Sequence, residues 1–293
     1  MPAALPVAAA APLAPLLDGP PLPARVAVTG RWAAYLVAPP AAAGRPDRVV
    51  VIATPDAVVP PCAVVLRAGL IPADLVAVGD EVTVGGGGLR TPAGVLAVRR
   101  WWTPPRLPTG TPDRASARIA AALLGEPPVP GGPDDTRSRA LLAAAPAAEA
   151  VLAGDVTGAV TVLTRVIGLG PGSTPSGDDV AAAVLLAGRA VGAPRVDRTA
   201  DAVLRAAAGR TTPVSMGLLA EAAAGRAVPP VVGALRALLG AAPVEPAVRR
   251  LLAVGSTSGT DLATGLVATV AAAVRRTRPR PPQDLSASLR RSA

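Results

Sequence analysis

The hydrophobic pattern of the chain changes near residue 102, and this change constrains the fold more than any other feature. Before that point, short valine-rich runs separated by turn residues are typical of β-strands; they cover residues 26–28, 34–37, 49–52, 63–66, 82–84 and 95–98. Beyond it, longer alanine- and leucine-rich runs have helical length; they cover residues 113–124, 135–144, 147–167, 180–191, 199–208, 214–224, 232–239, 248–254 and 262–274. The two patterns predict an α+β protein in which a small N-terminal β-barrel or sandwich precedes a larger all-α domain.

The boundaries of these parts follow from local composition. A stretch rich in proline, glycine and threonine follows Trp102 and ends at Pro112, as is typical of a linker between domains. The apolar start of the chain contains four prolines within its first 17 residues and no basic segment, which argues against a signal peptide or a membrane span. We therefore predict four parts: a flexible N-terminus over 1–24, a β-rich domain over 25–108, an α-helical domain over 109–276 and a basic disordered tail over 277–293.

The residue types that are missing restrict the chemistry. The chain has no histidine and no lysine, so imidazole bases, Schiff bases and histidine-containing zinc sites are excluded. Its single cysteine, Cys62, excludes an internal disulfide and fits a reducing, cytoplasmic setting. Phenylalanine is also absent, so the core is expected to consist of small aliphatic side chains in close contact. Catalysis would have to use carboxylates, arginines, hydroxyls and backbone N–H groups.

The net charge of +9 is concentrated at the C-terminus, where residues 275–293 hold six arginines and one aspartate. A basic tail of this kind can bind polyanions through charge alone. No aromatic residues stand among these arginines to stack on bases, so specific nucleic-acid binding is not expected. We expect a solvated tail and no membrane association.

The densest group of polar residues is the segment Gly168-Leu-Gly-Pro-Gly-Ser-Thr-Pro-Ser-Gly-Asp-Asp179. Its glycines permit backbone conformations that turn N–H groups toward one point, and Ser176 is placed to cap a helix that begins at Val180. A helix N-terminus favours an anion. Asp178 and Asp179 would repel one, so they imply a bound cation such as a divalent metal, a substrate amide N–H, or an arginine. The alternative is that the segment only caps a helix.

Two further loops carry a similar set of residues. Ser258-Gly-Thr-Asp261 repeats Ser176-Gly-Asp-Asp179 at an offset of 82 residues, so two helix starts of the same kind are expected to face one another across a pocket. Gly209-Arg-Thr-Thr-Pro-Val-Ser215 contributes Arg210, whose guanidinium can bind a carboxylate or a phosphate through two hydrogen bonds. For both loops, an ordinary capped helix is the alternative.

In their order along the chain, the three motifs resemble those of AllH-like proteins. That family was long a domain of unknown function and includes a subunit of oxamate carbamoyltransferase, which works with AllF-like and AllG-like subunits in allantoin breakdown, a part of purine catabolism. The resemblance covers roughly residues 25–275. The chain departs from the family pattern at Ser173, where an aliphatic residue is expected, and at Ser256, where the family commonly has histidine.

The resemblance implies a subunit that transfers a carbamoyl group between carbamoyl phosphate and a small carboxylate or amide such as oxamate. The alternative is a non-catalytic subunit that binds a small anion or acts as a scaffold in a metabolic complex. No cofactor is expected, and a divalent metal at the two aspartates is left open. The candidate catalytic residues are Asp178, Asp179 and Arg210, and the candidate substrate-binding residues are Gly170, Gly172, Thr174, Ser176, Gly177, Thr211, Thr212, Ser215, Ser258, Gly259, Thr260 and Asp261.

Overall fold

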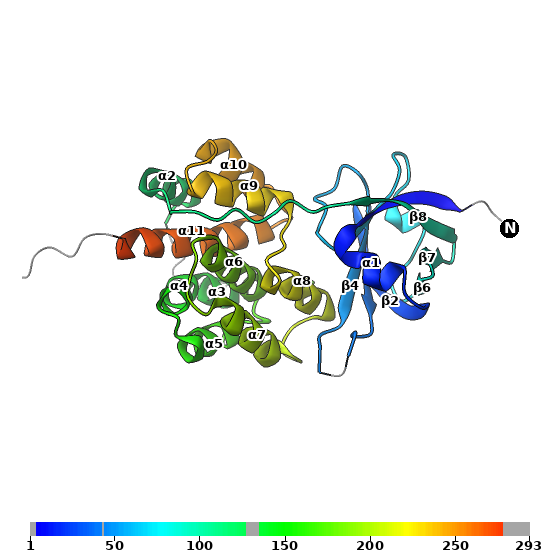
Figure 1. The fold of residues 1–293 in the computed structure, drawn as a ribbon, viewed down its shortest axis with the longest axis horizontal. Helices are drawn as coiled ribbons and strands as arrows, with labels where there is room; N and C mark the ends of the chain where they lie inside the picture. The colour runs from blue at the N-terminus through cyan, green and yellow to red at the C-terminus, as the bar shows by residue number, and fades with distance from the viewer. Residues whose placement is uncertain (1–3, 43, 127–134, 278–293) are drawn as a thin grey trace, which may run out of the picture.

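The computed structural model describes residues 4–42, 44–126 and 135–277, which form a β-barrel and a helical domain (Figure 1). Eight strands of these residues close the barrel in the order β1-β5-β4-β3-β2-β6-β7-β8. β1 pairs in parallel with β8, and β4 in parallel with β5. The α+β prediction, with a barrel first, is confirmed.

The elements of the barrel are β1 (Leu5–Ala10), a 3-10 helix (Ala11–Leu13), α1 (Ala14–Leu17), β2 (Leu22–Thr29), β3 (Ala33–Ala38), β4 (Arg48–Ala53), β5 (Ala63–Val65), a 3-10 helix (Pro72–Asp74), β6 (Glu81–Gly85), β7 (Gly88–Thr91) and β8 (Gly94–Trp102).

Burial along the strands shows where the helical domain contacts the barrel. In β3, Ala34, Leu36 and Ala38 are buried and the residues between them are partly exposed, as expected for a strand with one face in a core. β4 differs, because every residue from Val49 to its end is buried. Helix α8 packs on this strand so closely that a Cβ added at Gly217 would overlap the side chain of Val49. The junction of the two domains therefore lies at β4.

The barrel begins at Leu5, so the prediction of a flexible N-terminus over residues 1–24 is wrong from that residue on. β1 lies between β5 and β8, and Ala9 and Ala10 are fully buried there. Leu17 of α1 is also fully buried in the barrel core. The segment lacks the valine-rich alternation of the other strands. Its backbone nevertheless supplies the hydrogen bonds that close the sheet and remove its edges.

The helical domain is built around two long helices, α6 and α11, which make the largest contact between any two helices (Figure 1). The other helices pack around this pair, and within the described structure α8 makes the main contact of the helical domain with the barrel strands, at β3 and β4. The helices are α2 (Arg114–Leu124), α3 (Asp135–Leu142), α4 (Ala144–Ala153), α5 (Val156–Thr164), α6 (Ser176–Ala190), α7 (Val196–Ala207), α8 (Pro213–Ala223), α9 (Pro229–Leu238), α10 (Val244–Leu252) and α11 (Ser258–Arg276).

The helix expected over residues 147–167 is in fact two helices, α4 and α5. Gly154 ends α4 in the left-handed conformation, with φ of 69°. Asp155 then caps α5, because its Oδ1 accepts a hydrogen bond of 2.9 Å from the backbone N–H of Gly158. Glycine takes this φ without steric cost, and aspartate is a favoured N-cap. A Gly-Asp pair therefore interrupts an otherwise continuous apolar run.

The segment that links the domains runs extended along the helical domain from β8 to α2 (Figure 1). It is attached through its backbone: the N–H of Gly110 donates to the carbonyl of Ala190 at 3.0 Å, and the N–H of Asp113 to that of Leu238 at 2.9 Å. These bonds satisfy the N–H groups of a segment whose prolines prevent regular structure. The linker is therefore part of the surface of the helical domain.

Two other predictions concern the C-terminus and the membrane. The predicted basic tail over 277–293 lies outside the described residues from position 278 on. In the part of the chain that the structure describes, no helix combines the length and the apolar character that crossing a membrane requires.

The close packing of α6 and α11 depends on a glycine at their contact. A Cβ added at Gly265 of α11 would lie 2.6 Å from the Cβ of Ala183 and 2.9 Å from the carbonyl oxygen of Val180. Both distances are shorter than van der Waals contact, so only glycine fits at this position. The glycine holds the two helices at a distance that their small side chains can fill.

Replacing Gly265 with alanine is expected to lower the free energy of unfolding by about 1–3 kcal/mol, because the methyl group overpacks the helix contact. Gly233, inside α9, is the matched control, since no described residue lies within 4 Å of its added Cβ. Gly233→Ala should raise stability by up to about 1 kcal/mol through helix propensity. Urea unfolding followed by circular dichroism measures both changes, and equal effects at the two positions would contradict the packing described.

Candidate functional site

The two helix starts that share a sequence motif lie next to each other. The hydroxyl oxygens of Thr174, just before α6, and Ser258, the first residue of α11, are 3.2 Å apart. α6 and α11 therefore present their N-terminal ends to the same region beside the barrel. The N–H groups of Gly177 and Gly259 are already used within the protein, where they donate to the carbonyls of Leu169 and Val254. Both ends carry the partial positive charge of a helix dipole. This arrangement favours a negatively charged ligand.

Helix α6 starts earlier than the sequence indicated. It begins at Ser176, not at Val180, so Asp178 and Asp179 lie in its first turn and not in the preceding loop. Ser176 does not act as the expected cap: Pro175 is the N-cap residue, and the buried Ser176 Oγ has no hydrogen-bond partner among the described residues. A helix start at Ser176 points the two aspartates in different directions, because successive residues are about 100° apart around a helix.

The glycines of the repeated motif have a packing role. Gly177 and Gly259 each follow the first serine of their helix. A Cβ on Gly177 would overlap the carbonyl of Val166, and a Cβ on Gly259 would overlap that of Leu251. In each case the overlapped carbonyl belongs to the segment that precedes the loop. The shared motif therefore corresponds to two similar turns. In each of them a long helix starts directly against the end of the previous segment.

The glycines of the preceding loop differ in their surroundings. Gly170 has φ of 115°, and a Cβ there would lie 2.7 Å from the backbone nitrogen of Ser176, so this position requires glycine. Gly172 is exposed, and no described residue lies within 4 Å of its added Cβ. The loop is therefore shaped mainly by close approach at Gly170.

Asp178 connects the first and second motif loops and is almost fully buried, with 2% of its surface exposed. Its Oδ1 accepts a hydrogen bond of 2.8 Å from the backbone N–H of Gly168. Its Oδ2 accepts hydrogen bonds from the hydroxyls of Thr211 and Ser215, the latter at 2.5 Å. A buried carboxylate with three donors is satisfied by the protein itself. Asp178 therefore holds the two loops together.

The remaining hydroxyl groups reinforce these loops. Thr212 caps α8 by accepting a hydrogen bond from the N–H of Ser215, and its hydroxyl donates to the carbonyl of Ser173 at 2.6 Å. Thr260, in the first turn of α11, accepts a hydrogen bond from the hydroxyl of Thr264 through its carbonyl. Through its bond to Ser173, Thr212 of the second loop helps to fix the conformation of the first loop.

Asp179 is the neighbour of Asp178 in sequence, but its environment is different. Its Oδ2 is buried and has no hydrogen-bond partner among the described residues. Burial raises the pKa of Asp179 to about 8; the charges of Asp261 and Asp178 raise it as well, and the Ser258 hydroxyl acts in the opposite direction. At neutral pH this carboxyl is therefore mostly protonated and able to donate a hydrogen bond.

Asp261 occupies the position in α11 that corresponds to Asp179 in α6 and is fully buried. Its Oδ1 accepts from Nε of Arg137 at 3.0 Å and from Nη2 at 2.8 Å. Its Oδ2 has no partner among the described residues. Arg137 lies on α3 and balances the charge of Asp261. Sequence reasoning assigned no chemistry to Arg137, and a pair formed across 124 residues leaves no local sequence signal.

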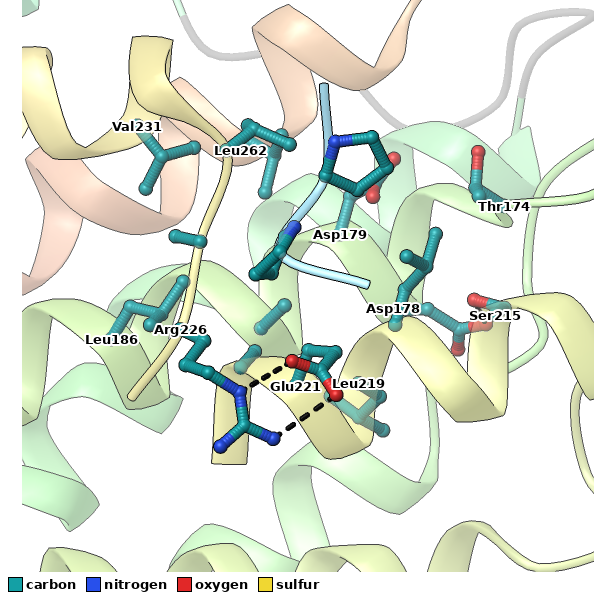
Figure 2. Close-up of a pocket in the computed structure, with 17 residues that line it drawn as sticks. Thr174, Asp178, Asp179, Leu186, Ser215, Leu219, Glu221, Arg226, Val231 and Leu262 are labelled. Carbon is teal, nitrogen blue, oxygen red and sulfur yellow. Dashed lines mark hydrogen bonds and ion pairs between the residues drawn. The ribbon is translucent and has the colours of Figure 1, made fainter. Parts of the chain in front are cut away.

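Two cavities at the domain junction share Asp179. The outer one, of about 450 Å³, also contacts Trp32 and Tyr35 of the barrel, and burial raises the pKa of the Tyr35 phenol. The inner one, of about 90 Å³, is lined by residues of α6, α8 and α11 (Figure 2) and also by Pro61. The residues that line both are Pro60, Thr174, Asp179, Leu218, Val228 and Leu262.

The inner cavity also contains an ion pair that the sequence did not indicate. Glu221 accepts from Nε of Arg226 at 2.5 Å and from Nη2 at 3.0 Å, as the dashed lines in Figure 2 show. The two residues come from the end of α8 and the turn after it. A spacing of five residues around Gly225 gives no recognisable pattern in a sequence, so this pair became visible only in three dimensions.

Arg210 does not join this group. Its side chain is exposed, and it lines neither of the two cavities formed by the described residues. Its neighbours Gly209 and Thr211 line a separate cavity of about 740 Å³ beside α7. Ser256, where the AllH-like pattern has histidine, is also exposed and does not contact either cavity within the described structure.

The aspartates offer little for a divalent metal. Both oxygens of Asp178 already accept hydrogen bonds, whereas Asp179 and Asp261 each have one oxygen without a partner among the described residues. A divalent cation needs several oxygen ligands. Among residues 4–42, 44–126 and 135–277, no group of three or more acidic, cysteine or histidine residues is arranged to hold one.

The structure has a barrel followed by a helical domain, with two cavities where the barrel meets the starts of two long helices. Residues 166–270 match the sequence model of the family described as oxamate carbamoyltransferase subunit AllH, which confirms the AllH-like resemblance. This segment includes all three motif loops, both long helix starts and the Glu221–Arg226 pair. Neither the curated proteins nor the solved structures contain a match.

Asp179→Asn is expected to change how stability depends on pH. The folded protein keeps the Asp179 proton up to about pH 8, whereas the unfolded chain releases it near the ordinary pKa of 3.8. Between these values the folded state binds more protons, so this group lowers stability as pH rises. The asparagine variant should lose that slope and be more stable than wild type at pH 8 by on the order of 2 kcal/mol. Urea unfolding from pH 5 to pH 8.5 measures this, and parallel profiles for the two proteins would contradict it.

Proposed function

We propose that this protein is the subunit of a carbamoyltransferase that binds a small carboxylate or amide, such as oxamate, together with carbamoyl phosphate. We place both ligands in the neighbouring outer and inner cavities, which share part of their lining. The observation that carries the proposal is Asp179, a largely protonated carboxyl group in the wall shared by the cavities, beside two helix N-termini. The match to the AllH family over residues 166–270 supports the reaction type.

The charges around the pocket support an anionic ligand. Two carboxylates in the first turn of α6 would ordinarily repel a phosphate. Here Asp178 is turned toward three hydrogen-bond donors of the protein, and Asp179 carries little charge at neutral pH. The N-terminal ends of α6 and α11 add partial positive charge near Thr174 and Ser258, which is favourable for phosphate.

The position of Asp179 also suits the proton transfer that the reaction needs. In the degradative direction, a phosphate oxygen attacks the carbamoyl carbon of oxalurate, and the bond from that carbon to the oxamate nitrogen breaks. The leaving nitrogen takes a proton, and phosphate loses one as it becomes carbamoyl phosphate. Asp179 would give its proton to the nitrogen and regain one from phosphate. A pKa of about 8 makes the carboxyl an acid that is still protonated at neutral pH.

The proposed setting is a complex. The family description names AllH as a subunit, and we propose AllF-like and AllG-like proteins as its partners in the cytoplasmic breakdown of allantoin, a part of purine catabolism. The exposed Trp32 and Val58 border the outer cavity, with 52% and 42% of their surfaces exposed. Apolar surface beside a cavity mouth is suited to contact with another protein.

A non-catalytic, anion-binding subunit is the second candidate. The chain has no histidine. The exposed Ser256 stands at the position where the family commonly has one. If catalysis in the family requires an imidazole, this chain would bind ligands and leave turnover to a partner. The two candidates make the same prediction for binding and opposite predictions for the role of Asp179 in turnover.

The test is steady-state carbamoyl transfer by the chain assembled with AllF-like and AllG-like partners, with oxamate and carbamoyl phosphate as substrates. Asp179→Asn is expected to lower kcat by about 100-fold, as loss of an acid–base group does, with a smaller change in KM. Asp74→Asn, an exposed carboxylate of the barrel, is the control and should have no effect. Normal kcat for Asp179→Asn would favour the anion-binding subunit, and failure of the assembly to bind either substrate would rule out both candidates.

A further inference from the structure

Tyr35 is the only tyrosine of the chain, and the structure places it in the lining of the outer cavity. It lies in β3, whose side chains alternate between the barrel core and the outer surface. Its neighbours Ala34 and Leu36 are fully buried in the core, so the ring of Tyr35 projects from the opposite face of the strand. Helix α8 packs on the outside of β3 and β4. The ring therefore lies at the junction of the two domains.

The hydroxyl of Tyr35 has no hydrogen-bond partner among the described residues. Burial is the main cause that raises the pKa of this phenol, and the charges of Cys62 and Asp179 raise it further. The phenol is therefore a neutral donor near pH 7, and it lies close enough to Asp179 for the two groups to interact electrostatically. A largely buried donor without a partner is costly unless a ligand or a water molecule accepts its hydrogen bond.

Asp179 is a second donor beside this cavity. Its carboxyl group is mostly protonated at neutral pH, and Figure 2 shows it on the opposite side of the inner cavity from the Glu221–Arg226 pair. It also lines the outer cavity, where the described lining residues include no arginine and Asp56 is the other acidic one. Tyr35 and Asp179 thus offer two uncharged donors to the same space. Such donors suit a carbonyl oxygen and the negative charge that develops on it in a transition state.

We propose that the Tyr35 hydroxyl donates a hydrogen bond to the carbonyl oxygen of the carbamoyl group, which binds in the outer cavity beside Asp179. This inference rests on the proposed function, because it concerns the same reaction in the same pair of cavities. It adds a catalytic residue from the barrel, outside the residues 166–270 that match the family model. The barrel then completes the site, and the helical domain alone is insufficient for turnover.

The hydrogen bond from Tyr35 acts at the step that forms the tetrahedral intermediate. When phosphate attacks the carbamoyl carbon of oxalurate, the π electrons of the carbonyl bond move onto the oxygen. The charge that develops there strengthens the hydrogen bond from Tyr35, which keeps its proton throughout. The carbonyl bond forms again as the bond to the oxamate nitrogen breaks, and Asp179 gives its proton to that nitrogen. Oxygen and nitrogen are attached to the same carbon, so the two donors act on neighbouring atoms.

Tyr35→Phe tests this role in the chain assembled with AllF-like and AllG-like partners. The change removes one hydroxyl and keeps the ring that packs against the barrel core. We expect kcat for carbamoyl transfer to fall by about 100-fold with a smaller change in KM, because the lost hydrogen bond is strongest in the transition state. Thr91→Val is the matched control: it removes a hydroxyl that donates to the carbonyl of Gly94 in the β7–β8 hairpin, and kcat should not change.

The single tyrosine allows a second measurement, which does not depend on turnover. Tyrosine labelled with carbon-13 at Cζ gives one NMR signal from the full-length chain, and this signal responds to the hydrogen bond of the phenol. At pH 7, carbamoyl phosphate should shift the signal of the chain or of the assembled complex. Inorganic phosphate, which has no carbonyl group, should leave it nearly unchanged. An equal shift with both ligands would contradict the carbonyl contact.

The outcomes separate this inference from the proposed function. Normal kcat for a folded Tyr35→Phe, verified by thermal unfolding, would overturn the role of Tyr35 and leave that of Asp179 intact. A lower kcat without any shift of the tyrosine signal would indicate an indirect effect of packing and would also overturn the contact. If the wild-type complex showed no turnover, the proposed function would fail. A shift with carbamoyl phosphate alone would then still support the contact with Tyr35, and an unchanged signal would overturn it.

Discussion

The close approach of α6 and α11 is the constraint on which the site depends. Gly265 allows the two helices to touch along their length, while Gly177 and Gly259 allow each to start directly against the segment before it. These contacts bring two helix N-termini together beside the barrel, where the hydroxyls of Thr174 and Ser258 meet. A chain without phenylalanine can pack helices in this way because its core side chains are small.

Within this frame, two adjacent aspartates have separate tasks. Asp178 holds two loops together, because its Oδ2 accepts from Thr211 and Ser215 and its Oδ1 accepts from the N–H of Gly168. Asp179 forms part of the lining that the two cavities share, and burial keeps its carboxyl group protonated near neutral pH. The pairing of a structural carboxylate with a free carboxylic acid explains how an acidic sequence motif can form part of a site for an anionic ligand.

The sequence allowed the class of fold and the meeting of the motif loops to be predicted, because strand and helix periodicities and helix-start motifs are local signals. It did not show which aspartate would be satisfied, since that depends on whether α6 begins at Ser176 or at Val180. It also missed β1, whose partners are β5 and β8, and the Arg137–Asp261 pair. These features arise from contacts between distant segments, which leave no pattern along the chain.

The central claim is that the cavities between the barrel and the two helix starts hold a small carboxylate, and its most direct test is a crystal structure of the full-length chain with oxamate. The account predicts oxamate in the inner cavity, within hydrogen-bond distance of Asp179. An empty inner cavity, with oxamate bound instead in the larger cavity beside α7, would contradict it.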